Sequence, residues 1–230
     1  MGLGRPTWGG HPYFLALDTP NIVRYLWAMA SRDTTERRRI RSRELILSAA
    51  RELVLEVGPD KVSLRKIAER AGYSPSSLYE YFDGKDALLR ALSQRVAERL
   101  SRRLATVPQS LPAPRRLVRY GQEYVRFARA LPEDFLLLFL HLRSQRTAHA
   151  QPVEAASPYR PILLAAQEGL ATGAFNAAAG DAETLAYGLW AVVHGLAMLQ
   201  LTHLKGYEVD FEVADSAVIE SYVAGLTRRT

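Results

Sequence analysis

One stretch constrains the fold more than any other: VSLRKIAERAGYSPSSLYEYFDGK, Val62 to Lys85. Ser63 is placed to cap a helix over about residues 64–71, because its hydroxyl can accept a backbone N–H that the first helical turn leaves free. Gly72 then ends this helix, since glycine takes the left-handed conformation at little steric cost. The dipeptide Ser74-Pro75 opens a second short helix, with serine as cap and proline at the first position. Two short helices joined by a tight turn form a helix-turn-helix.

The spacing of residue types inside the stretch supports this pattern. Ala68 is small where two crossing helices would touch, and Leu78 and Phe82, four residues apart, give the second helix a buried stripe. Its other face presents hydroxyls and an amine, which can bond phosphate oxygens and base edges. The hydroxyls alone could equally form a solvated polar face. The helix-turn-helix and the basic residues around it favour nucleic-acid binding instead. The residues of this face are Ser74, Ser76, Ser77, Tyr79, Tyr81 and Lys85.

The positive charge of the chain is concentrated around this motif. The net charge of the 230 residues is +6, and Arg32 to Arg103 alone holds 17 basic and 11 acidic residues, so the remainder is balanced. Such a footprint is expected of a nucleic-acid-binding domain. A basic membrane-surface helix would also be positive, but it would not need the turn chemistry.

A basic run, TTERRRIRSR, leads into the helix before the motif. Cations at a helix N-terminus oppose the macrodipole, so contact with phosphates or a minor groove explains the run better than a solvated helix start. The helix itself carries an apolar face that should pack on the motif, and Gly58 ends it. The face consists of Ile46, Ala50, Leu53 and Val57.

Residues 1–35 have no clear hydrophobic period. A signal peptide is not expected, because Asp18 and Arg24 interrupt any apolar core and no basic segment precedes it. We predict a flexible N-terminal extension. The alternative is that the start codon is misassigned and that translation begins at Met29. A short helix around Asn21–Met29 is possible within it.

The rest of the chain predicts helices throughout, so the fold class is all-α with about nine helices. Asp83 can cap a long connecting helix from about residue 87 to 105, which three prolines then end. The further helices are expected over about 115–131, 133–150, 158–172, 181–204 and 209–226.

The helix over about 181–204 is apolar on two opposite sides, so both sides should be buried, one in its own subunit and one against a partner chain. A membrane span is the alternative, because no charge occurs between Thr184 and Leu204. His194, Gln200 and two glycines weaken it, and no membrane association is expected. The two stripes are Tyr187, Trp190, His194, Ala197 and Leu201, and Leu185, Leu189, Val192, Leu196 and Leu199.

From about Arg39 to Leu92 the chain resembles the DNA-binding domain of TetR-family transcriptional regulators. The matching segments are ILSAARELVLEVG and VSLRKIAERAGYSPSSLYEYFDGKDALL. The resemblance implies a cytoplasmic homodimer that binds double-stranded operator DNA and leaves it when a small-molecule effector enters the C-terminal domain, as a repressor would. It implies a three-helix DNA-binding domain at residues 36–86 and a helical ligand-sensing and dimerisation domain at 87–230.

A second resemblance lies near the C-terminus, in LWAVVHGLAML. Trp190, His194 and Gly195 are similar to the Trp-x-x-x-His-Gly signature of a TetR subgroup. This resemblance implies that the last two helices form a four-helix bundle in the dimer, with the ligand cavity beside them.

The family resemblance also implies DNA-binding positions. Arg65, Ser76 and Ser77 match positions that read bases, and an arginine can contact guanine through two hydrogen bonds. Tyr79, Tyr81 and Lys85 match positions that mostly hold phosphates, although Tyr81 stands where many members have histidine and Tyr79 could equally be core. The candidate set is completed by the capping serines Ser63 and Ser74.

The candidate ligand site is an aromatic set on the later helices, because small-molecule sites use apolar linings with a few polar groups. The alternative is that these rings simply form the core. The candidates are Trp190, His194, Tyr187, Phe127, Phe135, Phe139 and His141.

An enzyme is the rival class. The chain has no cysteine, its five histidines show no metal-ligand spacing, and neither a Gly-rich phosphate loop nor G-x-S-x-G occurs. We therefore expect no catalytic residue, metal or cofactor. A helical protein with enzymatic or non-regulatory ligand-binding activity is the alternative, because side chains that meet only in space leave no sequence motif.

Overall fold

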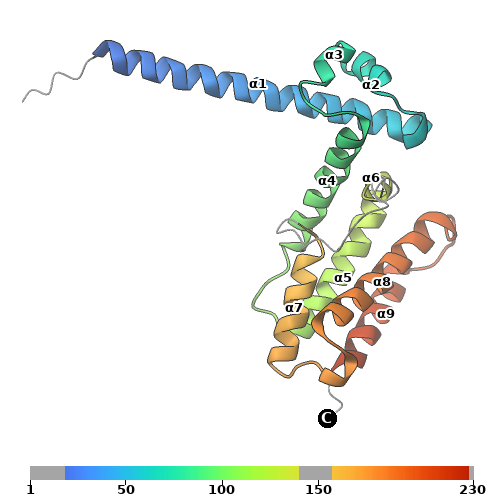
Figure 1. The fold of residues 1–230 in the computed structure, drawn as a ribbon. Coiled ribbons are helices and arrows are strands. Elements are labelled where there is room, and N and C mark those ends of the chain that lie inside the picture. Colours follow the sequence, from blue (N-terminus) through green and yellow to red (C-terminus); the bar gives the residue numbers. More distant parts are fainter. Residues whose placement is uncertain (1–18, 140–156, 228–230) are drawn as a thin grey trace, which may run out of the picture. The chain divides into compact units, whose positions relative to one another are not determined.

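The computed structural model describes the backbone of residues 19–139 and 157–227, and the side chains of 34–139 and 157–227. The described part is all-α, as predicted, with nine α-helices and no β-strand (Figure 1). Two short 3-10 turns lie at Pro59–Lys61 and Ala177–Ala179. The helices are α1 (Thr19–Val57), α2 (Leu64–Ala71), α3 (Pro75–Leu78), α4 (Lys85–Leu104), α5 (Ala113–Ala130), α6 (Pro132–Leu137), α7 (Arg160–Ala171), α8 (Ala182–Thr202) and α9 (Phe211–Leu226).

The predicted helix-turn-helix is present as α2 and α3. The Ser63 hydroxyl accepts the Lys66 N–H at 3.3 Å, and the Ser74 hydroxyl accepts the Ser77 N–H at 3.1 Å. Gly72 ends α2 in the left-handed conformation, with φ of 75°. Local capping chemistry therefore sets both helix boundaries.

Buried side chains hold the motif together. Ala68 and Leu78 are fully buried and Phe82 is nearly so, which confirms the predicted crossing and stripe. On α1 the predicted apolar face is right at its first three positions, but Val57 is 37% exposed and Val54 is buried instead. Residue 57 is the last of the helix, so no further turn packs over it.

The chain divides into two compact units, residues 1–45 and 46–230. The boundary falls inside α1, which begins at Thr19 and so includes part of the expected extension. The helix-turn-helix shares the second unit with the C-terminal helices. The division at 1–35, 36–86 and 87–230 stays a prediction.

Two helix ends differ from the prediction. Gly84, with φ of 101°, is the N-cap of α4, and the Asp83 side chain makes no capping bond there. The helix expected over 133–150 is present as α6 up to Leu137, and residues 140–156 lie outside the described part.

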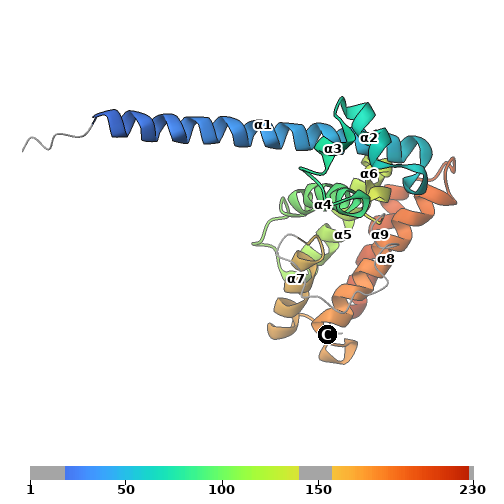
Figure 2. The same ribbon diagram turned by 45° about the horizontal axis from the view of Figure 1, so that its top comes forward.

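In the C-terminal half, α5 runs alongside α8 and α9 in both ribbon views (Figures 1 and 2). Gly121 of α5 permits this approach, because a Cβ there would lie 2.9 Å from Ile219 of α9 and 3.1 Å from Val193 of α8. The Tyr222 hydroxyl of α9 also donates to the Leu185 carbonyl of α8 at 3.0 Å. These three helices pack against one another, and α7 packs against α5 and α8.

The buried stripe of α8 takes members from both predicted stripes. Within one chain, Leu185, Leu189 and Ala197 are fully buried, whereas Tyr187 is 62% and Leu199 49% exposed. Burial of one side in its own subunit agrees with the prediction, and burial of the other side against a partner chain stays a prediction. Part of the apolar surface of α8 faces outward.

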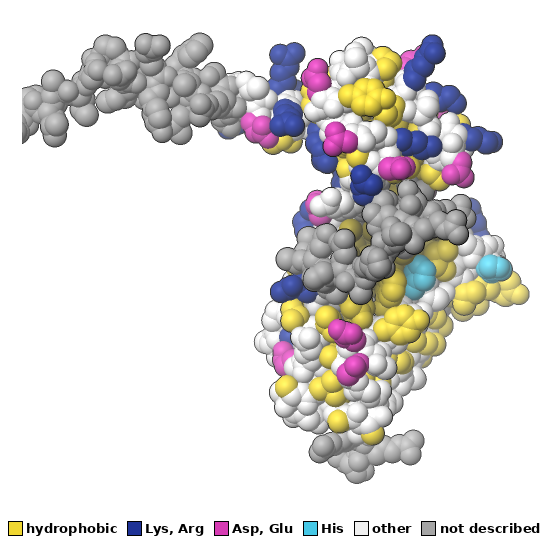
Figure 3. Space-filling view, in the orientation of Figure 1, with side chains coloured by type: hydrophobic (Ala, Val, Ile, Leu, Met, Phe, Trp, Pro, Cys, Tyr) yellow, Lys and Arg dark blue, Asp and Glu magenta, His cyan; other side chains and the backbone are white. Residues whose placement is uncertain are grey.

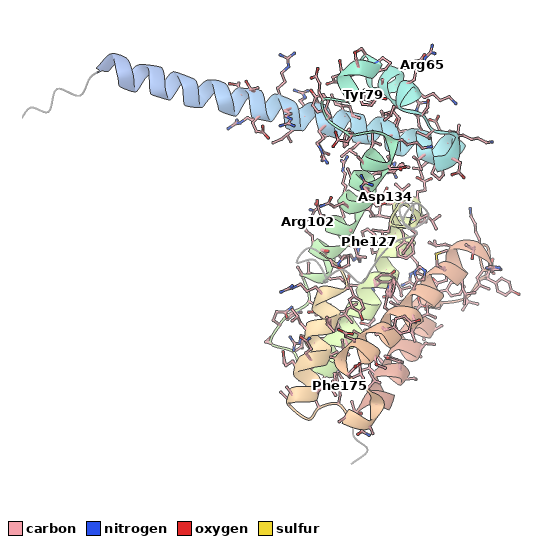
Figure 4. All side chains as sticks on the ribbon, in the orientation of Figure 1. Arg65, Tyr79, Arg102, Phe127, Asp134 and Phe175 are labelled. Atoms are coloured by element: carbon pink, nitrogen blue, oxygen red, sulfur yellow. The ribbon has the colours of Figure 1, made fainter. Side chains whose placement is uncertain are left out.

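Gly169→Ala should lower the free energy of unfolding by about 1–3 kcal/mol, because overpacking a filled core forces side chains out of their rotamers. A Cβ at Gly169 would lie 2.2 Å from the ring of Phe175, which is 1% exposed. Phe175, labelled in Figure 4, lies in the segment between α7 and α8. Urea unfolding followed by circular dichroism measures the change.

Gly225→Ala is the matched control, because a Cβ there meets nothing within 4 Å. This variant should gain up to about 1 kcal/mol from helix propensity. Equal urea midpoints for the two variants would show that the close approach of Phe175 to Gly169 does not exclude a Cβ at this position.

Candidate functional site

The outer face of α2 and α3 presents most of the predicted DNA-binding side chains. Arg65 and Ser76 are exposed, and Tyr79 is 62% exposed, so Tyr79 is not part of the core. Figure 4 labels Arg65 on α2 and Tyr79 at the C-terminal end of α3. The two capping serines, Ser63 and Ser74, are also exposed. These groups can donate to phosphates or base edges without any rearrangement of the core.

The remaining candidates are half-buried and partly engaged. The Ser77 hydroxyl shares a hydrogen bond of 2.8 Å with Ser74. Tyr81 packs edge-on against Tyr73, with ring centroids 6.3 Å apart. Lys85 donates to the Asp60 carbonyl at 3.4 Å, which holds its amine at the start of α4. If Ser77, Tyr81 and Lys85 contact DNA, they do so with side chains that these intramolecular contacts already hold in place.

An ion pair fixes α2 against α1. Arg70 donates two hydrogen bonds of 2.8 Å to the carboxylate of Glu56, and Glu52 lies 3.4 Å away. A guanidinium that binds a carboxylate through two parallel bonds is geometrically specific. The contact therefore orients the face that carries Arg65.

Basic side chains lie around α2, as Figure 3 shows by its dark blue atoms, whereas α3 itself carries no Lys or Arg. Within the first unit, Arg37, Arg38, Arg39 and Arg41 of the basic run are all exposed. Such a concentration of cations favours a polyanion and makes association depend on salt.

A buried carboxylate connects α6 with the helices of the DNA-binding part. Asp134 of α6, 3% exposed at its side chain, accepts hydrogen bonds from Arg51 of α1 and Arg99 of α4. Arg51 also lies 3.4 Å from Glu133. Figure 4 shows Asp134 at the end of α6 that lies toward α1. We call Arg51, Arg99 and Asp134 the junction triad. Charge-assisted bonds of this kind resist displacement of one helix relative to the others.

An aromatic cluster surrounds His194 of α8. The ring of Phe139 lies 4.8 Å from that of His194, and those of Phe135 and Trp190 lie 6.2 and 6.1 Å away. The Tyr124 hydroxyl is 3.3 Å from His194 Nδ1. The structure thus brings four of the predicted ligand residues together and adds Tyr124.

Of the three remaining predicted ligand residues, two are described, and neither has a ring contact with His194. Phe127 is a core residue at 2% exposure, Tyr187 is exposed, and His141 lies outside the described residues. Tyr159, which the sequence prediction missed, packs against Trp190 at 6.1 Å. Tyr159 is far from Trp190 along the chain, so no local sequence pattern indicates that the two rings meet.

Burial changes the proton equilibria of the cluster. It lowers the pKa of His194 below its ordinary 6.5, and it raises the pKa of Tyr124 to about 12. A neutral imidazole and a neutral phenol therefore share the hydrogen bond at neutral pH. The surroundings suit an apolar ligand with a few polar groups.

His194→Phe should reduce the loss of stability on acidification. Since the folded-state pKa of His194 lies below its unfolded value, its contribution is fully present above about pH 6.5 and is lost as pH falls toward the folded-state pKa. The described side chains in contact with the ring, those of Tyr124, Phe135, Phe139 and Trp190, carry no charge at these pH values. Urea midpoints at pH 7.5 and 5.5 give the change.

The exposed His203 supplies the control. Between pH 7.5 and 5.5, the urea midpoint of His203→Gln should fall as much as that of the wild-type protein. The urea midpoint of His194→Phe should fall less. If the urea midpoints of both variants fall as much as that of the wild-type protein, His194 does not contribute to the loss of stability on acidification.

Among the residues whose side chains are described, no cluster of three or more His, Asp or Glu could hold a metal ion. The described helices bring together hydrogen-bond donors and cations on one face and aromatic rings on another. The first arrangement can bind a phosphate backbone, and the second offers apolar ring surface with a few polar groups, which suits contact with a small apolar molecule.

Comparison with known proteins decides the family. Residues 46–92 match the model of bacterial regulatory proteins of the tetR family, and residues 117–220 match that of the tetracyclin repressor-like C-terminal domain. The chain belongs to the TetR family. It is therefore a DNA-binding transcriptional regulator, and its family consists of regulators rather than enzymes in general.

One curated relative agrees with this TetR assignment, and two solved structures share the fold. The chain is 26% identical over 189 residues to the HTH-type transcriptional regulator BetI of Brucella suis, covering 80% of this chain and 90% of BetI. A Rhodococcus sp. RHA1 protein of unknown function shares 27% identity with a TM-score of 0.67, over 81% of this chain and 96% of that one. A tetR-family regulatory protein from Rhodococcus RHA1, at 19% identity, has the same fold with a TM-score of 0.64, over 82% and 98%.

Proposed function

We propose that this TetR-family protein is a ligand-responsive repressor that binds a palindromic operator as a homodimer. The observation that carries the proposal is the exposed face of α2 and α3, with Arg65, Ser76 and Tyr79 outward over a buried core. Arg65, Ser76 and Ser77 read bases in this proposal, and Tyr79, Tyr81 and Lys85 hold phosphates. The operator is double-stranded DNA.

The outward apolar surface of α8 and α9 supports a homodimer. Trp190 is 37% exposed, and on α9 Val213 is 65% and Val218 44% exposed. Exposed apolar surface of this kind marks a protein interface, and two copies of the helix pair would form a four-helix bundle. Two recognition helices would then enter major grooves about 34–36 Å apart.

The aromatic cluster supports a small-molecule effector site and membership of the Trp-x-x-x-His-Gly subgroup. Trp190 and His194 are in ring contact there, as one turn of spacing on α8 requires. An effector releases the protein from DNA only if it binds the released conformation more tightly than the bound one.

We assign the protein to the cytoplasm, where its DNA is. One described helix, α8, is long and apolar enough to cross a membrane by length and composition, a test that core helices also pass. In the proposed dimer its outward surface meets the partner chain instead.

Footprinting combined with sedimentation equilibrium tests the proposal. We expect the free protein to sediment as a dimer and to protect two inverted half-sites whose centres lie about one helical turn of DNA apart. A monomer in solution, or protection of one isolated half-site, would contradict it. Val218→Glu should weaken the dimer, and Glu220→Gln, also on α9, is a control for a change at an exposed charge.

A further inference from the structure

A cavity of about 480 Å³ lies apart from the aromatic cluster. It is formed by the C-terminal ends of α5 and α8, the start of α6 and the segment that leads into α9. Its volume is within the range of small-molecule sites. None of its lining residues belongs to the group around His194. The cavity is therefore a separate candidate for a ligand.

The cavity has an apolar wall. Leu201 of α8, Leu204 just after this helix and Phe211 of α9 line it, and all three are half-buried. Leu136 of α6 faces it as well and is 42% exposed. An alkyl chain laid against these side chains would remove apolar surface from water, which favours binding.

Three charged residues line the cavity, and two of them are cations: Arg129, Lys205 and Glu133. Glu133 has the Arg51 guanidinium 3.4 Å away as its counter-charge. Lys205 has no ion-pair partner among the residues whose side chains are described. The surplus charge at the cavity is therefore positive.

Arg129 is held in a fixed position. Its Nη1 donates to the buried Asp215 at 3.2 Å, and Gln200, also in the cavity wall, donates to the same carboxylate at 2.8 Å. Glu212 lies 3.7 Å from Arg129 but pairs more closely with Arg126, at 2.6 Å. The polar wall is thus organised before any ligand arrives, which lowers the entropic cost of binding.

We propose that this cavity binds a small amphipathic carboxylate. Its alkyl chain contacts Leu201, Leu204 and Phe211, and its carboxylate lies beside Lys205 and Arg129. The proposal goes beyond regulation of DNA binding, because it concerns a second ligand site. Its test contains no DNA, so the outcome does not depend on whether the protein is a repressor.

Isothermal titration of the full chain with octanoate, octan-1-ol and octylamine tests the site. Octanoate should bind about tenfold more tightly than octan-1-ol, since a charge-assisted contact contributes about 1.4 kcal/mol or more. Octylamine should bind most weakly. Equal affinities for octanoate and octan-1-ol would overturn the proposal.

Two variants locate the binding. Lys205→Gln should lower the affinity for octanoate about tenfold and leave that for octan-1-ol unchanged. Leu204→Trp should fill the cavity and abolish binding of both. Lys61→Gln, in the turn before α2, is the control and should bind as the wild-type protein does. If Lys205→Gln binds octanoate with unchanged affinity, the carboxylate does not lie in this cavity.

Discussion

Asp134→Asn should lower the free energy of unfolding by about 3 kcal/mol, the largest stability effect we expect from a single change. The Asp134 side chain is 3% exposed and accepts hydrogen bonds from Arg51 and Arg99. Removing one member of a buried pair generally costs about 3–5 kcal/mol. The two arginines are 39% and 40% exposed, so water can solvate them in the variant, and the cost should fall at the lower end.

Glu133→Gln is the matched control, one residue earlier in the same helix. Glu133 is 65% exposed and lies 3.4 Å from Arg51, so its loss should cost less than about 1 kcal/mol. Urea unfolding followed by circular dichroism compares the variants. Equal midpoints for Asp134→Asn and Glu133→Gln would show that the junction triad does not stabilise the fold.

The second large effect concerns DNA recognition. Arg65→Ala should reduce affinity for the cognate operator by roughly 5- to 150-fold, which corresponds to the 1–3 kcal/mol of a bidentate base contact. Binding to unrelated duplexes should change much less, so base preference relaxes. Fluorescence anisotropy with the operator and with single-base variants of it measures the loss.

Lys85→Ala should behave differently, because a phosphate contact carries no base information. Its affinity for all duplexes should fall alike, and the slope of log affinity against log salt should decrease by about one. Lys205→Gln, on the segment after α8, is a control for loss of a positive charge outside the motif. If Arg65→Ala and Lys85→Ala lose specificity equally, the assignment of their roles is wrong.

Local chemistry made the helix-turn-helix predictable. Ser63, Gly72 and Ser74 each act on backbone groups within a few residues, so the sequence alone states where α2 and α3 begin and where α2 ends. The cap of α4 was predicted wrongly, because the sequence favoured Asp83, whereas the backbone places Gly84 at the cap. Boundaries of this kind depend on which residue the preceding turn places at the cap.

The junction triad has no sequence signal. Asp134 is 83 residues from Arg51 and 35 from Arg99, and one acidic residue among many on the chain does not reveal that packing will bury it. The aromatic cluster was predicted in part, because Trp190 and His194 lie one turn apart on α8. Tyr124 and Tyr159 join it only through the fold.

The surface of α8 shows a different limit. Its two apolar stripes indicated burial on two sides, yet periodicity does not say which side meets the same chain and which a partner. In one chain Leu189 and Val193 are fully buried while Tyr187 remains exposed. The proposed partner would cover the remainder.

We expect this protein to bind its operator in preference to other DNA sequences. The most direct test is fluorescence anisotropy of the purified protein with duplex DNA from upstream of its own gene and with a scrambled duplex, both at about 0.15 M salt. We predict binding at least 1,000-fold tighter, or about 4 kcal/mol, to a duplex that holds the operator. Equal, weak and salt-sensitive binding to that duplex and to duplexes tiled across the rest of the genome would contradict the claim.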